Sequence, residues 1–112
     1  MQELHHRLLS DLEKIGISAD FTLELKPYSK IYYGRYDPNT NKVILYVYRD
    51  KGCSQVEEYK DLLMSLIHES VHYLQWTDKS FVRRKGVMHN AEFYHLFNKY
   101  RTKAEILLQE VI

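Results

Sequence analysis

The longest amphipathic pattern in the chain covers residues 56–76 and constrains the fold more than any other segment. Apolar residues recur there at the spacing of one buried helix face. Ser54 and Glu57 have the spacing of a capping box, so the sequence predicts a long helix that starts at this box. The stretch LIHESVHYLQW inside this helix also carries two histidines four residues apart. Imidazoles are costly to bury unless their nitrogens find partners, so these two histidines need an explanation.

A small sheet is expected before this helix. Residues 21–25 alternate apolar and polar side chains, and residues 30–36 and 42–49 are rich in β-forming side chains. The turn residues DPNTN separate the last two segments, so these segments should pair as an antiparallel hairpin. We expect a small antiparallel sheet, a meander of two to three strands.

Two further helical patterns complete the expected fold. In residues 3–15, leucine and isoleucine recur at helical spacing, and Gly16 follows as a C-terminal cap. A last helix is expected over about residues 89–108. With 112 residues, the chain fits a single domain, 1–112, of the α+β class.

Composition argues against several classes of protein. The 16 basic and 15 acidic side chains nearly cancel, so no overall field favours nucleic acid or an anionic membrane. The longest apolar run, residues 43–48, is far shorter than the roughly 20 residues that span a bilayer, and residues 1–16 lack the apolar block of a signal peptide. Cys53 is the only cysteine, which excludes an intramolecular disulfide and a cysteine-based zinc ribbon. We therefore expect a cytoplasmic protein with no membrane partner.

His68, Glu69 and His72 form an HExxH motif in the long helix. Helix positions four apart differ by about 40° in direction and about 6 Å along the axis, so both imidazoles can reach one ion. Glu69 projects about 100° away from His68, which can place its carboxylate beside the ion's open position. The motif predicts a site for one zinc ion, where Glu69 accepts a proton from a zinc-bound water that attacks a carbonyl. The alternative is a structural histidine pair or a coincidence in a histidine-rich chain.

Zinc needs a third protein ligand, and the segment HNAEFYHLF, residues 89–97, contains the candidates. His89 and Glu92 would share a helix face, while His95 would lie nearly opposite His89. His89 follows a polar loop long enough to return the chain to the HExxH helix, so it is the favoured ligand and Glu92 the alternative. Otherwise Glu92 is a first-turn acid stabilised by the helix dipole, and His95 is a surface or partly buried histidine.

These segments resemble a known family. The motifs IHESVH and HNAEF, with the upstream GRYDPNTNKVILY, are similar to the SprT-like (Spartan-type) zinc metallopeptidase core over about residues 33–97. The resemblance implies a minimal zincin fold, in which the HExxH helix follows a hairpin and a C-terminal helix bears the third ligand. It also implies that His68, His72 and His89 hold zinc and that Glu69 is the general base.

The chain departs from the family pattern at Tyr73 and Asn90, where the family usually has a small residue and a glycine. Larger members that act on proteins crosslinked to DNA often add a cysteine-rich zinc ribbon, which a chain with one cysteine cannot contain. A more distant resemblance to compact gluzincins would make Glu92 the third ligand.

Two other features could assist a zincin. Such enzymes commonly bind their substrate as an added strand at a sheet edge, and residues 43–48 could supply that edge, although core packing also explains their apolar character. Tyr73 and Tyr94 are nearest in sequence to the proposed ligands, and either hydroxyl could donate to the oxyanion that forms during attack.

Residues 79–85, KSFVRRK, form the only dense basic patch. Lys79, Arg83, Arg84 and Lys85 could contact nucleic-acid phosphates, but a solvated loop is the favoured interpretation because one aromatic and four cations make a weak footprint. The expected function is therefore a zinc metalloendopeptidase that hydrolyses peptide bonds in a protein or peptide substrate. The alternative is a non-catalytic zincin-like metal-binding protein that engages a partner or nucleic acid.

Overall fold

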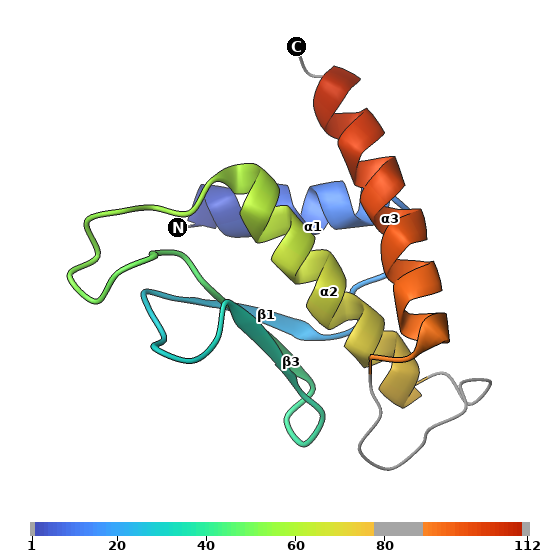
Figure 1. Cartoon of the computed structure of the whole chain (residues 1–112), viewed down its shortest axis with the longest axis horizontal. Helices are drawn as coiled ribbons and strands as arrows, with labels where there is room; N and C mark the ends of the chain where they lie inside the picture. Colours follow the sequence, from blue (N-terminus) through green and yellow to red (C-terminus); the bar gives the residue numbers. More distant parts are fainter. Residues whose placement is uncertain (1, 78–88, 111–112) are drawn as a thin grey trace.

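The computed structural model describes residues 2–77 and 89–110, which form helices around a small sheet (Figure 1). The elements in chain order are α1 (Gln2–Lys14), β1 (Thr22–Lys26), β2 (Gly34–Asp37), β3 (Lys42–Tyr46), α2 (Tyr59–Thr77) and α3 (Ala91–Glu110). Helix α2 contacts β2, β3, α1 and α3, so it is the central element of the fold. This arrangement confirms the α+β class expected from the sequence. None of the helices in the described ranges combines the length and apolarity that a membrane crossing requires.

The sheet is mixed, with the strand order β1-β3-β2. Strand β1 is parallel to β3, and β2 is antiparallel to β3, as the hairpin prediction required. The prediction of an antiparallel meander was wrong because β3 takes the central position. Val43, Ile44 and Leu45 are all buried there, and a strand with both faces buried is best placed between two others.

The central position of β3 also overturns the prediction that residues 43–48 supply a free edge. Over Lys42–Tyr46 the strand is hydrogen-bonded on both sides. Strand β2 is an outer strand and contacts α2, so β2 is the sheet edge next to the HExxH helix. It begins only at Gly34, and residues 30–33, which we expected in a strand, form a connection before it.

Helix α1 ends at Lys14 and is capped by Gly16, the glycine that the sequence indicated. Gly16 has a φ of 98°, a left-handed conformation that suits glycine. The N–H of Ile17 donates to the carbonyl of Leu12 at 3.1 Å, and the N–H of Gly16 donates to that of Glu13 at 3.0 Å. These two hydrogen bonds are those of a Schellman cap, which satisfies carbonyls at the end of the helix.

Helix α2 begins later than the capping box predicted. The Ser54 hydroxyl donates to the Asp50 carboxylate at 2.6 Å, so it caps no helix. The N–H of Glu57 donates to the carbonyl of Val47 at 2.8 Å, which keeps this segment extended beside the end of β3. The helix therefore starts at Tyr59, because side-chain and strand contacts occupy the groups that a capping box would use.

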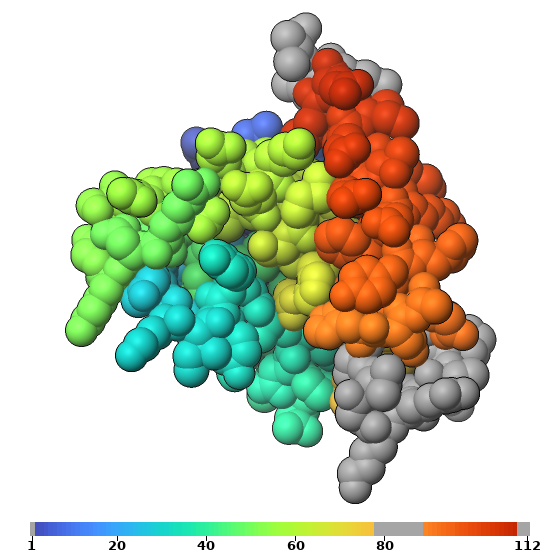
Figure 2. Space-filling model, viewed as in Figure 1, coloured from blue at the N-terminus to red at the C-terminus, as the bar shows by residue number. Residues whose placement is uncertain are grey.

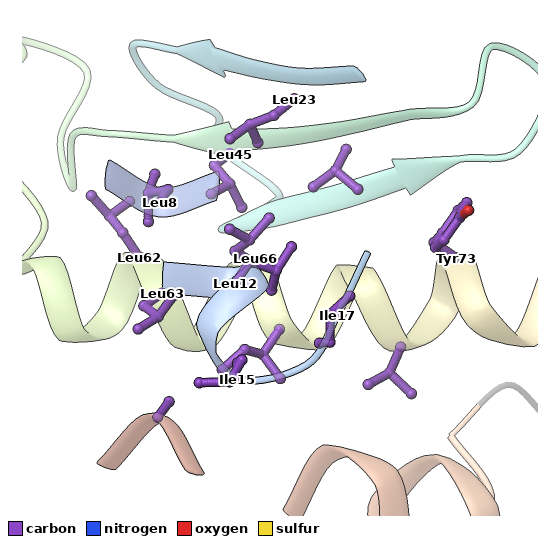
Figure 3. Close-up of a cluster of buried hydrophobic side chains, with 14 of the residues drawn as sticks. Leu8, Leu12, Ile15, Ile17, Leu23, Leu45, Leu62, Leu63, Leu66 and Tyr73 are labelled. Carbon is purple, nitrogen blue, oxygen red and sulfur yellow. The ribbon is translucent and has the colours of Figure 1, made fainter. Parts of the chain in front are cut away.

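The core lies between the sheet, α1 and α2 (Figure 3). Buried leucines from every layer meet there, namely Leu8, Leu12, Leu23, Leu45, Leu62, Leu63 and Leu66. Because these side chains hold the first half of α2 against the sheet, the HExxH residues in its second half have fixed positions relative to β2 and α3.

Candidate active site

Three imidazoles converge where α2 meets the start of α3. One ring nitrogen of each of His68, His72 and His89 lies within 4.8 Å of the others, and in the part of the chain that the structure describes this is the one such cluster of histidine, cysteine or acidic side chains. The Nε2 atoms of His72 and His89 are 3.1 Å apart. Their ring centroids are 4.8 Å apart, and that of His68 lies 4.9 Å and 5.2 Å from them. The three histidines could therefore hold one metal ion.

His89 is positioned by the beginning of α3. The predicted helix included His89, whereas α3 starts at Ala91 and His89 lies just before it. The Oδ1 of Asn90 accepts a hydrogen bond from the N–H of Phe93 at 2.9 Å, so Asn90 is the N-cap residue. This role explains the asparagine at a position where the SprT-like pattern has glycine.

Phe93 supports all three imidazoles, which the sequence had not indicated. Its side chain is fully buried, and its ring centroid lies 4.9 Å from His68, 4.7 Å from His72 and 4.9 Å from His89. The signal was its spacing, four residues after His89 and on the buried face of α3. An aromatic floor restricts the rings and excludes water from one side of the cluster.

The other nitrogens of the two α2 histidines have partners. Nδ1 of His72 donates to the Oε1 of Gln75 at 2.9 Å, and Nδ1 of His68 donates to the Oε2 of Glu69 at 2.6 Å. The Nε2 atoms are thereby left for an ion. Burial lowers the pKa of His72, the nearby imidazoles of His68 and His89 lower it further, and Gln75 and Glu69 oppose this. A lowered pKa favours the neutral imidazole that binds metals.

This donor set fits zinc. Three imidazoles on an apolar floor match the ligand type of catalytic zinc sites, which use three protein ligands and leave one position open. His89 is exposed, so the cluster is accessible from solvent on that side.

Glu69 lies beside the cluster, between α2 and β2. Its side chain is mostly buried and the residue is 7% exposed. A Cβ atom on Gly34 would lie 3.5 Å from the Cγ of Glu69, so the backbone of β2 passes close to the carboxylate side chain. That distance is an ordinary van der Waals contact, so Glu69 packs directly against β2.

An open cleft of about 410 Å³ lies between the start of β2 and the α2 residues His68 and Glu69. Tyr32, Tyr33 and Gly34 line it from the sheet side. In the space-filling view, α2 is visible between the cyan segment before β2 and the orange beginning of α3 (Figure 2). The sequence had not indicated these cleft residues, because their position depends on how β2 packs against α2.

The structure separates the remaining ligand candidates from the cluster. Glu92 and His95 are exposed on α3, and Glu92 is not part of the histidine cluster within the described residues. Of the two candidates for the third ligand, His89 is the one that lies in the histidine cluster of the described residues.

The two tyrosine candidates have different surroundings. Tyr73 is buried in the core, where its ring packs edge-on against Phe21 at 5.1 Å and Tyr36 at 5.8 Å (Figure 3). It therefore points toward the sheet and serves packing. Tyr94 is 52% exposed and its ring centroid lies 6.4 Å from that of His89, so it remains near the cluster.

The basic patch lies outside the described residues. Lys79, Arg83, Arg84 and Lys85 all fall within residues 78–88. Contact of this patch with nucleic acid stays a prediction from the sequence.

Comparisons with known proteins identify a solved structure with a similar fold but assign the chain to no family. No protein-family model matches the chain, and no curated protein matches it by sequence. The crystal structure of Wss1 from Saccharomyces cerevisiae is similar, with a TM-score of 0.67 and 15% sequence identity over 98% of this chain and 77% of that chain. The chain has a fold similar to that of Wss1. At this identity the likeness concerns the fold alone, and it agrees with the α+β architecture described above.

Proposed function

We propose that this chain is a zinc-dependent metallopeptidase of the HExxH type, which hydrolyses peptide bonds in a protein or peptide substrate. The observation that carries the proposal is the convergence of three imidazoles, one nitrogen of each within 4.8 Å of the others, with the Glu69 carboxylate 2.6 Å from Nδ1 of His68. In this proposal His68, His72 and His89 are the zinc ligands and Glu69 is the general base. The resemblance of IHESVH and HNAEF to the SprT-like core supports the same assignment.

Glu69 is suited to proton transfer. A zinc ion held by the three imidazoles supplies Lewis acidity, which polarises a peptide carbonyl and lowers the pKa of a water molecule. The Glu69 carboxylate accepts a proton from the attacking water as the water oxygen bonds to the carbonyl carbon. It then delivers that proton to the nitrogen of the leaving amine as the carbon–nitrogen bond breaks. In the structure the carboxylate lies 2.6 Å from Nδ1 of His68, next to the first proposed ligand.

The test is the variant Glu69→Gln, with Glu105→Gln at a half-buried position of α3 as the matched control. Zinc content is measured by elemental analysis and cleavage is measured on casein. We expect Glu69→Gln to keep one zinc ion per chain and to lose about 10²–10⁴-fold in cleavage rate, the usual contribution of a general base. Glu105→Gln should match the wild type.

Two outcomes would contradict the proposal. If Glu69→Gln cleaves casein at the wild-type rate, Glu69 is not the base. If the wild type binds zinc and cleaves no protein, the non-catalytic metal-binding alternative is favoured.

A further inference from the structure

One wall of the cleft beside Glu69 is formed by large apolar side chains that take no part in proton transfer. Ile31 and Tyr33 line this wall and are each 78% exposed. Both belong to the connection that precedes β2. Met64 of α2 and Phe97 of α3 line it from the helices. Large apolar side chains that stay exposed and gather in one place mark a binding surface, because covering them is favourable.

We propose that this cleft binds one large uncharged side chain of the substrate, aromatic or branched aliphatic, next to the peptide bond to be cut. The inference rests on the proposed function, since the same cleft contains Glu69 and His68. A side chain held there places its own backbone beside the carboxylate. The volume of the cleft, about 410 Å³, lies within the range of sites that enclose small ligands.

Gly34 lines the cleft at a point of close packing. A Cβ atom at this position would lie 2.9 Å from the Cδ2 of Leu45 and 3.2 Å from the carbonyl oxygen of Ile44, so a side chain there would force its neighbours to shift. The same Cβ would be 3.5 Å from the Cγ of Glu69. Glycine therefore lets β2 pack closely against β3 and Glu69 where it borders the cleft.

The charges of the cleft favour an uncharged occupant. Of the described residues that line it, none is lysine or arginine, and the one acid is Glu69. An acidic side chain would lose its hydration and face the Glu69 carboxylate, with no lysine or arginine among the described lining residues to pair with it. A basic side chain would lose hydration against the apolar wall, while Glu69 is 7% exposed and already accepts a hydrogen bond from His68.

The apolar surface ends at a charged cluster. Tyr33 and Met64 also line a neighbouring hollow with Arg49, Glu57 and Asp61. The Arg49 guanidinium lies 3.3 Å from the Glu57 carboxylate and 3.5 Å from that of Asp61. Because this hollow is charged, the apolar cleft does not continue in that direction.

The experiment measures peptide binding separately from cleavage. Synthetic peptides of glycine and serine carry a single Phe, Leu, Ala, Lys or Asp, and their affinity for zinc-loaded Glu69→Gln protein is measured by fluorescence anisotropy. We expect the Phe and Leu peptides to bind at least about tenfold more tightly than the other three, as burial of a large apolar side chain implies. Wild-type protein should cut the Phe peptide next to Phe, as located by mass spectrometry.

Two matched substitutions locate the binding surface. Ile31→Ser in the Glu69→Gln background should reduce the preference for Phe over Ala at least about threefold, because it removes part of the wall. Ile106→Ser changes an isoleucine that is 52% exposed on α3 outside the cleft and should leave the preference unchanged. Both positions are exposed, so neither change should unfold the chain.

The outcomes separate this inference from the proposed function. Equal binding of all peptides, tighter binding of a charged peptide, or an unchanged preference in Ile31→Ser would overturn the cleft assignment. Preferential binding of the Phe peptide without any cleavage by the wild type would support the cleft and contradict the peptidase.

Discussion

Nδ1 of His72 lies 2.9 Å from the Oε1 of Gln75, one turn further along α2. Gln75 is 3% exposed, so its amide is held in place by the surrounding protein. The amide oxygen accepts a hydrogen bond from the Nδ1–H group of His72. This bond fixes the imidazole tautomer whose Nε2 faces His89. Gln75 is thus a positioning residue for the proposed zinc site.

The variant Gln75→Leu should lower zinc affinity about 10- to 100-fold, the usual cost of losing a hydrogen-bond partner of a metal ligand. Affinity is measured by competition with a chelating dye. The control is Thr77→Val, which removes the hydrogen bond from the Thr77 hydroxyl to the Tyr73 carbonyl in the same part of α2. Equal zinc affinity in Gln75→Leu and Thr77→Val, with both chains folded by circular dichroism, would contradict the positioning role.

The identity of the third ligand gives a second prediction. His89→Ala should lower zinc affinity by more than about 100-fold, because losing a metal ligand weakens binding more than losing the hydrogen-bond partner of a ligand. Glu92→Ala and His95→Ala should retain one zinc ion per chain, since both residues are exposed and outside the histidine cluster in the described chain. Zinc is measured by elemental analysis after gel filtration. Loss of zinc in Glu92→Ala alone would restore the gluzincin arrangement.

Local patterns predicted the parts of the fold that depend on neighbouring residues. The helical spacing of α1 and its Gly16 cap, the hairpin of β2 and β3, and the HExxH residues on a helix were all visible in the sequence. Each of these depends on residues within a few positions of one another, where spacing and turn chemistry carry the information.

Long-range packing decided what the sequence did not predict. Strand β1 pairs in parallel with β3, and no local signal distinguishes this from a meander. The positions of Phe93 beneath the imidazoles and of Gly34 against Glu69 depend on how α3 and β2 dock on α2. The late start of α2 has the same origin, because Glu57 pairs with the end of β3 instead of joining the helix.

The close approach at Gly34 predicts a stability effect. Gly34→Ala should lower the free energy of unfolding by about 1–3 kcal/mol, because the added methyl meets the Leu45 side chain at 2.9 Å and the Ile44 carbonyl at 3.2 Å. Gly52→Ala is the matched control, since the nearest atom is 3.3 Å away on the Asp50 side chain. Urea denaturation in the presence of a chelator measures both. Equal stability of the two variants would show that the Leu45 side chain and the Ile44 carbonyl can shift to admit the methyl group without cost.

Zinc should stabilise the folded chain. A ligand that binds the folded state at 100 times its dissociation constant adds about 2.7 kcal/mol, which for a chain of this size raises Tm by roughly 10 °C. Differential scanning fluorimetry with zinc and with a chelator measures the shift. His72→Ala should abolish it, whereas His95→Ala should retain it. A zinc-induced shift that persists in His72→Ala would show that the ion binds elsewhere on the chain.

The contact between α2 and α1 predicts a pH-dependent stability. The Tyr59 hydroxyl donates a hydrogen bond to the Asp11 carboxylate, and the Arg7 guanidinium lies 3.5 Å from the centre of the Tyr59 ring. Burial, and then Asp11, raise the pKa of Tyr59 above that of a tyrosine in the unfolded chain. Folding therefore favours the protonated phenol. This contribution is fully present below about pH 10, where an unfolded tyrosine is still protonated, and is lost as pH rises through the folded-state pKa.

Tyr59→Phe should accordingly be less stable than the wild type at neutral pH, by about 1–2 kcal/mol, because the hydrogen bond to Asp11 is lost. The difference should narrow above about pH 10, since the unfolded wild type ionises at Tyr59 and the variant cannot. Chemical denaturation at a series of pH values measures the free energy of unfolding of both proteins. Tyr94→Phe, at a position 52% exposed on α3, controls for the general alkaline response. A difference between wild type and Tyr59→Phe that stays constant from pH 7 to well above 10 would show that Asp11 does not hold the phenol in its protonated form.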